Sequence, residues 1–146
     1  TKEKKEIYNQ SPNLLWLTPS PDGKLLAFAT FGKNKTVMVL PVEGGEPREG
    51  AKINGWSCWG MAWTPDSREI IYDNEFPPGG QGIEKGSELW KVSVERGSPQ
   101  KLWKMEGYFE ELRVHPDGQR IAFSSQAPYA EIWVMENFLQ EARESK

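Results

Sequence analysis

The chain is poor in the residues that metal binding, disulfide formation and hydrolytic catalysis require. Its 146 residues include one cysteine, Cys58, and one histidine, His115. A single cysteine excludes an internal disulfide and leaves the cellular compartment open. Cys58 and His115 are too few for a zinc site, and the serine elbow motif of a Ser-His-Asp hydrolase is missing. We therefore expect no metal, no other cofactor and no hydrolase triad.

Long apolar runs and an excess of basic charge are also missing. No apolar segment approaches the roughly 18 residues of a membrane-spanning helix, and nothing in the sequence has the pattern of a signal peptide. There are 18 Lys and Arg against 21 Asp and Glu, a net charge of -3, and the only basic cluster is at 2–5. This balance argues against a nucleic-acid partner. Because the chain begins at Thr1 and not at Met, we expect a processed product or a piece of a longer protein.

The sequence does contain one motif three times. A Pro-Asp turn followed by a short apolar strand occurs as SPDGKLLAF (20–28), TPDSREIIY (64–72) and HPDGQRIAF (115–123). After each copy comes a second strand-like segment with a large apolar residue near its centre: Met38, Trp90 and Trp133. A repeat of about 44 to 51 residues built only from strand-like pieces is typical of β-propeller blades.

Each copy predicts a meander of antiparallel strands. The first strands are expected at 14–18, 61–64 and 112–115, the second strands directly after the turns, and the third strands at 36–40, 88–94 and 131–135. Outer strands are expected at 50–53 and 100–104. The third copy offers no outer strand, whereas 5–10 is predicted to be an outer strand without a blade of its own. Propellers commonly complete their last blade with a strand from the other end of the chain.

We therefore predict an all-β fold of three four-stranded antiparallel propeller blades in a single domain. Residues 4–10 are a swapped outer strand, 12–53 blade 1, 54–104 blade 2, 105–139 blade 3 and 140–146 a tail. Three blades are too few to close a ring, since propellers have four or more. We expect two chains to form a six-bladed ring as a homodimer, in which 5–10 of each chain completes the third blade of the other.

The motif PDGKLLAF, the strand after it and the turn Gly-Gly-Glu-Pro at 44–47 resemble the Pro-Asp propeller repeat of the TolB-like family. The resemblance covers about residues 12–139. TolB-like propellers normally have six blades, so the chain resembles half of one. The resemblance implies a scaffold that binds partners at the channel mouth, and a periplasmic or extracytoplasmic location. The same family includes propellers that gate peptidase domains, so the fold alone does not give the function.

One face of the predicted propeller collects the unusual residues. It carries the insertion 74–87 and the linkers 54–60 and 106–110. Variable loops around the mouth of a rigid ring commonly bind ligands. We predict that this face binds a protein, a peptide or a glycan through six residues: Trp56, Trp59, Glu75, Tyr108, Phe109 and Glu110. The alternative for the four aromatic residues is packing beneath neighbouring loops.

Two other functions remain open. An enzyme acting on carbohydrate or peptide would use acidic residues at the mouth, namely Asp73, Glu75, Glu110 and Glu111, and a pair of carboxyl groups roughly 5 to 9 Å apart would favour it. A chain whose only property is assembly would be a piece of a larger propeller.

His115 is not expected to be catalytic. It occupies the position before Pro-Asp that Ser20 and Thr64 fill in the other copies. A polar side chain at this position can bond the backbone of the turn. The same reasoning assigns the repeated aspartates to turn formation and not to chemistry.

Overall fold

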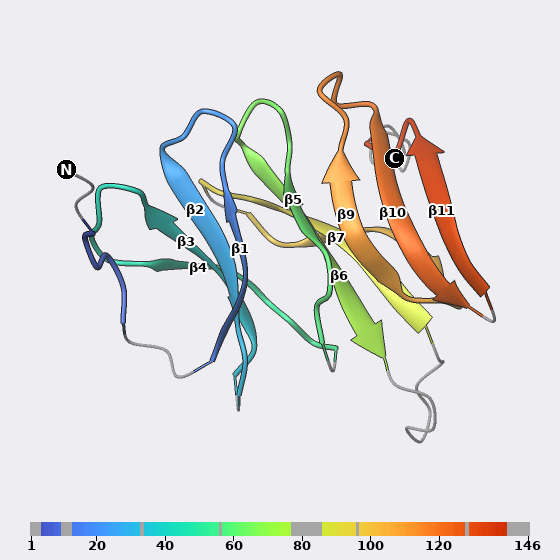
Figure 1. Ribbon diagram of the computed structural model, residues 1–146, viewed down its shortest axis with the longest axis horizontal. Helices are drawn as coiled ribbons and strands as arrows, with labels where there is room; N and C mark the ends of the chain where they lie inside the picture. Colours follow the sequence, from blue (N-terminus) through green and yellow to red (C-terminus); the bar gives the residue numbers. More distant parts are fainter. Residues whose placement is uncertain are drawn as a thin grey trace.

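The computed structural model describes residues 4–9, 13–32, 34–55, 57–76, 86–95, 97–127 and 129–139. All regular structure in these ranges is β-strand, and none of them contains a helix. A helix long and apolar enough to cross a membrane is accordingly absent from these ranges. The strands form three antiparallel sheets that follow one another along the molecule (Figure 1).

Each sheet is a meander in which every strand pairs with the next one in the sequence. Blade 1 contains β1 (Leu14–Pro19), β2 (Leu25–Thr30), β3 (Thr36–Pro41) and β4 (Arg48–Lys52). Blade 2 contains β5 (Met61–Trp63), β6 (Glu69–Phe76), β7 (Gly86–Ser93) and β8 (Gln100–Met105). Blade 3 contains β9 (Phe109–Val114), β10 (Arg120–Ala127) and β11 (Tyr129–Glu136). This arrangement confirms the all-β class and the three blades.

Residues 5–9 form no strand in the single chain, and their pairing with the third blade of another chain stays a prediction. These residues are irregular and lie against blade 1, where the ring centroid of Tyr8 is 5.1 Å from that of Phe28. Lys5 Nζ also donates a hydrogen bond to the carbonyl oxygen of Glu43 at 2.9 Å. Blade 1 already has four strands, with β4 as its outer strand. Gln10 lies outside the described residues.

The insertion predicted at 74–87 is shorter than expected. β6 continues to Phe76 and β7 begins at Gly86, with Asn74 opposite Glu88 in the ladder. Both ends of the insertion are therefore strand, and 77–85 lies outside the described residues.

The three Pro-Asp turns share one geometry. An Asp Oδ1 accepts the backbone N–H two residues later in each: Asp22 from Lys24 at 3.1 Å, Asp66 from Arg68 at 3.1 Å and Asp117 from Gln119 at 2.9 Å. The next residue after each Asp has a positive φ, which is 71° at Gly23, 61° at Ser67 and 70° at Gly118. Glycine adopts this conformation without strain, and two of the three copies have it. The predicted role of the aspartates is confirmed.

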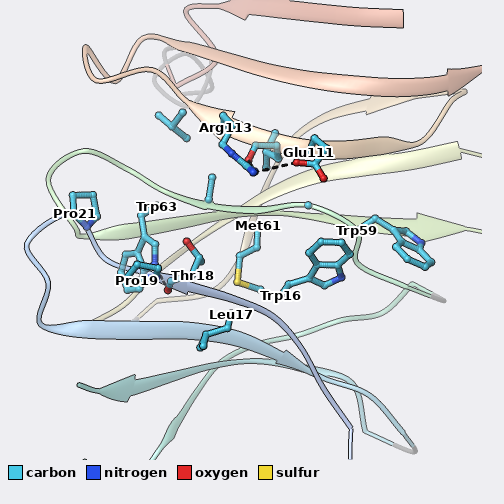
Figure 2. Close-up of a pocket in the computed structure, with 14 residues that line it drawn as sticks. Trp16, Leu17, Thr18, Pro19, Pro21, Trp59, Met61, Trp63, Glu111 and Arg113 are labelled. Carbon is cyan, nitrogen blue, oxygen red and sulfur yellow. Dashed lines mark hydrogen bonds and ion pairs between the residues drawn. The ribbon is translucent and has the colours of Figure 1, made fainter. Parts of the chain in front are cut away.

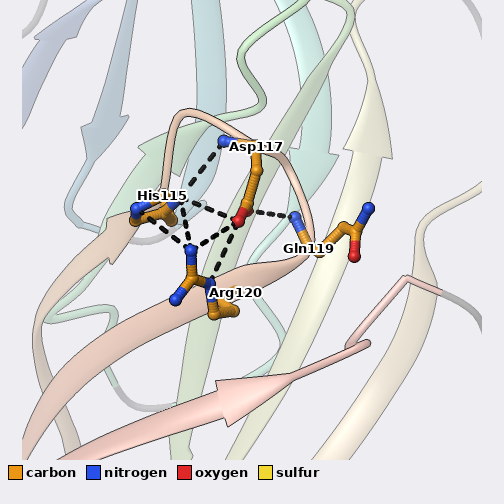
Figure 3. A network of polar contacts seen from close by, with 4 residues as sticks. All are labelled: His115, Asp117, Gln119 and Arg120. Atoms are coloured by element: carbon orange, nitrogen blue, oxygen red, sulfur yellow. Dashed lines mark hydrogen bonds and ion pairs between the residues drawn. The ribbon is translucent and has the colours of Figure 1, made fainter.

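His115 belongs to the third turn (Figure 3). Its Nδ1 accepts the backbone N–H of Asp117 at 3.2 Å, and Arg120 Nη2 lies 2.7 Å from Asp117 Oδ2. The N–H of Gln119, and then the Arg120 guanidinium, lower the pKa of Asp117 to about 2. The predicted turn role of His115 is confirmed.

Replacing His115 by serine is expected to change the free energy of unfolding by no more than about 0.5 kcal/mol. Serine occupies this position in the first copy, where Ser20 Oγ accepts the N–H of Leu25 at 3.0 Å. Urea denaturation measures the difference. A loss above about 2 kcal/mol would mean that His115 has contacts that the turn does not explain.

Two apolar layers, one between each pair of adjacent blades, form the core. Between blades 1 and 2, the small residues Ala27, Val37 and Val39 pack against Ile70 and Tyr72. Between blades 2 and 3, Ile71 and Leu89 pack against Ile121 and Phe123. Blade 2 therefore turns Ile70 and Tyr72 toward blade 1, and Ile71 and Leu89 toward blade 3.

Candidate functional site

The innermost strands of the three blades line a groove of about 400 Å³ (Figure 2). These strands, β1, β5 and β9, occupy the positions that face the central channel of a closed propeller. The apolar wall of the groove is formed by Trp16, Leu17, Pro19, Trp59, Met61 and Trp63. On the β9 side lie Glu111 and Arg113, which form an ion pair at 3.1 Å.

An aromatic pair from two different blades lies in this groove. The rings of Trp16 and Trp59 meet edge to face, with centroids 6.0 Å apart and an interplanar angle of 68°. Trp16 is 37% exposed and Trp59 is 43% exposed. Large, partly exposed tryptophans are the side chains that most often contribute strongly to protein binding. The pair is therefore the strongest candidate for ligand contact.

Backbone bulges direct side chains into the groove. Trp16 and Glu111 have φ values of 56° and 52°, and the strand register shifts where each of them lies. Both residues are six positions before the aspartate of the following turn, and Gly60 has this position in blade 2. Bulges re-aim side chains and often occur next to functional sites. Trp16 was missed by the sequence analysis, and its shared offset with Glu111 is the signal that could have identified it.

Trp59 is held in place by β6. Asp73 Oδ1 accepts the backbone N–H of Trp59 at 2.7 Å and that of Gly60 at 2.6 Å. The N–H of Glu75 donates to the carbonyl oxygen of Ser57 at 2.9 Å. The indole N–H of Trp59 donates to Glu75 Oε2. One strand thus fixes both the main chain and the side chain of Trp59.

Asp73 is a fully buried carboxyl group. Burial raises its pKa to about 7, although the N–H groups of Gly60 and Trp59 act in the opposite direction. Burial, and then the charge of Asp73, also raise the pKa of the neighbouring Cys58 thiol. Within the described part of the chain, Asp73 Oδ2 has no hydrogen-bond partner. The group can therefore change its charge near neutral pH inside the protein.

The structure brings together only part of the predicted loop surface. Trp59 and Glu75 are in contact, as described above. Tyr108 is half-buried, and neither Tyr108 nor Glu110 is among the described residues that line the groove. Trp56 lies outside the described residues.

The prediction that Phe109 is a surface residue is wrong. Its side chain is fully buried, with its ring 4.7 Å from Phe123 and 5.8 Å from Trp103. The linker expected at 106–110 ends early because β9 begins at Phe109. Phe109 is eight residues before Asp117, as Cys58 is before Asp66, and Cys58 is fully buried too.

The four acidic residues of the enzyme alternative are all engaged with other groups. Asp73 binds two backbone N–H groups, Glu75 binds the indole of Trp59, and Glu111 pairs with Arg113. Glu110 also has an interaction. Of these contacts, those of Asp73 and Glu75 hold the Trp59 segment, whereas the Glu111–Arg113 pair is exposed.

Comparison with known proteins gives fold relatives only. No family model matches the chain, and no curated protein does. A TolB protein from Agrobacterium tumefaciens is 23% identical, with a TM-score of 0.64 over 81% of this chain and 40% of that one. TolB from Acinetobacter baumannii is 18% identical, with a TM-score of 0.64 over 83% and 29%. The β-propeller domain of the Trilobed protease from Pyrococcus furiosus is 14% identical, with a TM-score of 0.61 over 88% and 41%.

These similarities confirm the TolB-like propeller fold that the repeat predicts. The chain spans less than half the length of each of these three proteins. At this level of identity the likeness concerns the fold, and function must be argued from the site.

Proposed function

We propose that the chain is a non-enzymatic binding scaffold whose inner groove takes up an extended peptide segment of a partner protein. The observation that carries this proposal is the Trp16–Trp59 pair, half-exposed and contributed by two blades to one groove. Rigid aromatic anchors supply much of the binding energy at protein interfaces. A pair set by two adjacent blades is also preorganised, which reduces the entropic cost of binding.

The shape of the groove favours a peptide over a glycan. The two indole rings are tilted by 68°, so they do not present one flat platform of the kind on which a sugar ring stacks. Among the described residues, the innermost strands β1, β5 and β9 each pair with only one other strand, so one edge of each has no ladder partner. Single groups on these edges bond side chains, as the Thr18 carbonyl oxygen does with the Trp63 indole N–H at 3.0 Å. An extended peptide can bond such edges while its side chains enter adjacent pockets. Glu111 and Arg113 add charged groups on the β9 side.

The contacts of the acidic residues support a binding role over the enzyme alternative. General acid–base catalysis needs a carboxyl group that can reach the substrate. Asp73 is fully buried, and Glu75 is occupied by the Trp59 indole. The enzyme alternative predicts turnover of oligosaccharides or peptides, which chromatography of the reaction mixture would detect.

Replacing Trp16 or Trp59 by alanine is expected to weaken peptide binding by about 30-fold, since truncation of a central tryptophan typically costs about 2 kcal/mol or more. The probe is a fluorescein-labelled linear peptide selected on the native chain from a phage-displayed library. Fluorescence anisotropy gives the Kd for each variant. Both side chains are partly exposed, so thermal melting should change little.

The matched control is Trp133→Ala, which truncates a tryptophan of similar exposure on β11, outside the groove. Its affinity for the same peptide should equal that of the native chain. Selected peptides that bind the Trp16 and Trp59 variants as tightly as the native chain would refute the groove as the binding site. Binding of arrayed glycans, lost in the same two variants, would favour a glycan instead.

We further propose that two chains close a six-bladed ring. Ile132 is 87% exposed and Val134 is 61% exposed on the face of blade 3 that points away from blade 2. At the same repeat positions in blade 1, Val37 and Val39 are 0% and 1% exposed because blade 2 covers them. An apolar face that another blade covers elsewhere in the same chain fits a further blade here as well.

The outer side of blade 3 is also incomplete. A groove of about 290 Å³ lies between blades 2 and 3 and is lined by Trp103, Phe123 and Trp133, among others. In blade 2 the outer strand β8 covers β7, whereas β11 has no such neighbour among the described residues. Residues 5–9 of a second chain fit this edge because they already lie on the Phe28 side of their own blade 1. That side faces away from blade 2, where the third blade of another chain would dock.

Light scattering at micromolar concentration tests the ring. A single chain has a mass of 16.6 kDa, and we expect about twice that value. A stable monomer that does not aggregate would refute the homodimer. It would favour a chain whose remaining blades belong to a longer protein.

A further inference from the structure

The segment that carries the exposed indole of Trp59 is held by Asp73, a fully buried residue that a ligand cannot contact. The segment from Ser57 to Gly60 runs beside β6 through an isolated bridge between Ser57 and Glu75. Asp73 lies two residues before Glu75 on the same face of this strand, and its Oδ1 receives two consecutive N–H groups of the segment at 2.7 and 2.6 Å. The backbone N–H of Asp73 in turn donates a hydrogen bond to the carbonyl oxygen of Gly60 at 3.2 Å.

We propose that Asp73 is the positioning residue of the aromatic pair: its ionised carboxylate fixes the segment that presents Trp59 to Trp16, and its protonation loosens that segment. The role is distinct from ligand contact, because the carboxyl group is fully buried behind the backbone that it binds. The consequence for peptide binding rests on the function proposed above, whereas the effect on Trp59 itself does not.

Taken together, the surroundings of Asp73 disfavour its ionised form. The titratable groups that face it are Glu75 from the same strand and the buried thiol of Cys58 from the segment. Leu89, opposite Asp73 on β7, and Leu112 of β9, which lies beside Gly60, are apolar. No basic side chain contributes to the shift of the carboxyl group. Burial without a basic partner raises its pKa to about 7, so its charge changes near neutral pH.

Protonation weakens the hold on the segment for two reasons. An ionised carboxylate forms charge-assisted hydrogen bonds with backbone N–H groups, which are roughly twice as strong as neutral ones. A protonated carboxyl group carries a new O–H donor, and Oδ2 has no hydrogen-bond partner within the described part of the chain to receive it. Above the midpoint the segment is therefore held firmly, and below it the order of Trp59 decreases.

The test uses the ligand-free, ¹⁵N-labelled chain. The amide resonances of Trp59 and Gly60 are expected to titrate together between about pH 5 and pH 9 with a midpoint near the pKa of about 7. In Asp73→Asn, which keeps an oxygen acceptor and does not titrate, the two amides should no longer shift with pH. Flat amide resonances in the native chain would overturn the proposal, and so would an unchanged titration in the variant.

Two controls separate positioning from general structural effects. Glu75→Gln should alter the indole N–H resonance of Trp59 and leave the midpoint of the amide titration within about half a pH unit. Asp22→Asn, in an exposed turn of blade 1, should leave the Trp59 and Gly60 amides unchanged. If Asp73→Asn does not fold, the native chain still tests the proposal, because flat Trp59 and Gly60 amide resonances would overturn it.

The same experiment distinguishes the two proposals. If the amides titrate as expected and the selected peptide binds equally at pH 5.5 and pH 8, Asp73 positions Trp59 but the groove is not the peptide site. If the peptide binds through Trp59 and the amides do not titrate, the groove is the site and Asp73 does not control it. Both proposals are supported if the native chain binds the peptide more weakly at pH 5.5 than at pH 8 and the affinity of Asp73→Asn is the same at both pH values.

Discussion

Replacing Phe109 by alanine is expected to lower the free energy of unfolding by about 3 to 5 kcal/mol, which is a large part of the stability of a domain of this size. The ring is fully buried between blades 2 and 3, edge to face with Phe123 at 4.7 Å and with Trp103 at 5.8 Å. Truncation removes these contacts and leaves a cavity in the apolar layer between blades 2 and 3. Urea denaturation followed by circular dichroism measures the loss.

The adjacent Tyr108→Ala variant is the matched control, because Tyr108 is only half-buried and precedes β9. It should cost less than half as much as Phe109→Ala. Equal and small effects in both variants would mean that Phe109 is not part of the core. They would support the sequence-based prediction that Phe109 is a surface residue.

The blades could be predicted from the sequence because their signals are local and repeated. The Pro-Asp turn uses side-chain to backbone bonds within five residues, such as Asp22 Oδ1 to Lys24 N–H and Ser20 Oγ to Leu25 N–H. Ile70 and Tyr72 alternate with Ile71 along β6, and the two sets face different neighbouring blades. Local chemistry of this kind does not depend on distant parts of the chain.

The candidate site was less predictable because its contacts join distant segments. Trp16 and Trp59 come from different blades, and their meeting depends on a bulge at Trp16 that strand alternation does not signal. The bonds from Asp73 to the Trp59 segment join residues 14 positions apart through an acidic side chain that composition places at the surface. Phe109 was misplaced because the start of β9 was set three residues too late, which is the usual uncertainty of strand ends.

The position of residues 5–9 shows a different limit. Their sequence is compatible with an outer strand, yet a strand forms only where a neighbouring edge is free. Within one chain they meet blade 1, which already has its four strands, and they pack there through Tyr8 without pairing. The blade that lacks an outer strand among the described residues is blade 3, whose last strand β11 lies at the other end of the row of blades (Figure 1). A second chain would bring the two together.

Replacing Ile132 by glutamate is expected to abolish the proposed ring while leaving the single chain folded. Ile132 is 87% exposed in the single chain, so a charge there should change the free energy of unfolding by no more than about 0.5 kcal/mol. In the ring it would take the environment of Val37, which is fully buried. An unpaired buried charge costs roughly 3 to 5 kcal/mol, and the two-fold axis places one at each of two seams.

The resulting loss of dimer affinity should exceed roughly a thousandfold, since each 1.4 kcal/mol is a factor of ten. Sedimentation at micromolar concentration should then show the native chain as a dimer and the Ile132→Glu variant as a monomer. Leu17→Glu is the matched control, because Leu17 is also exposed but lines the inner groove, which stays open to solvent in a ring. Loss of the dimer in both variants would indicate contact through the groove instead of through the face of blade 3. A dimer that persists in Ile132→Glu would exclude that face from the interface.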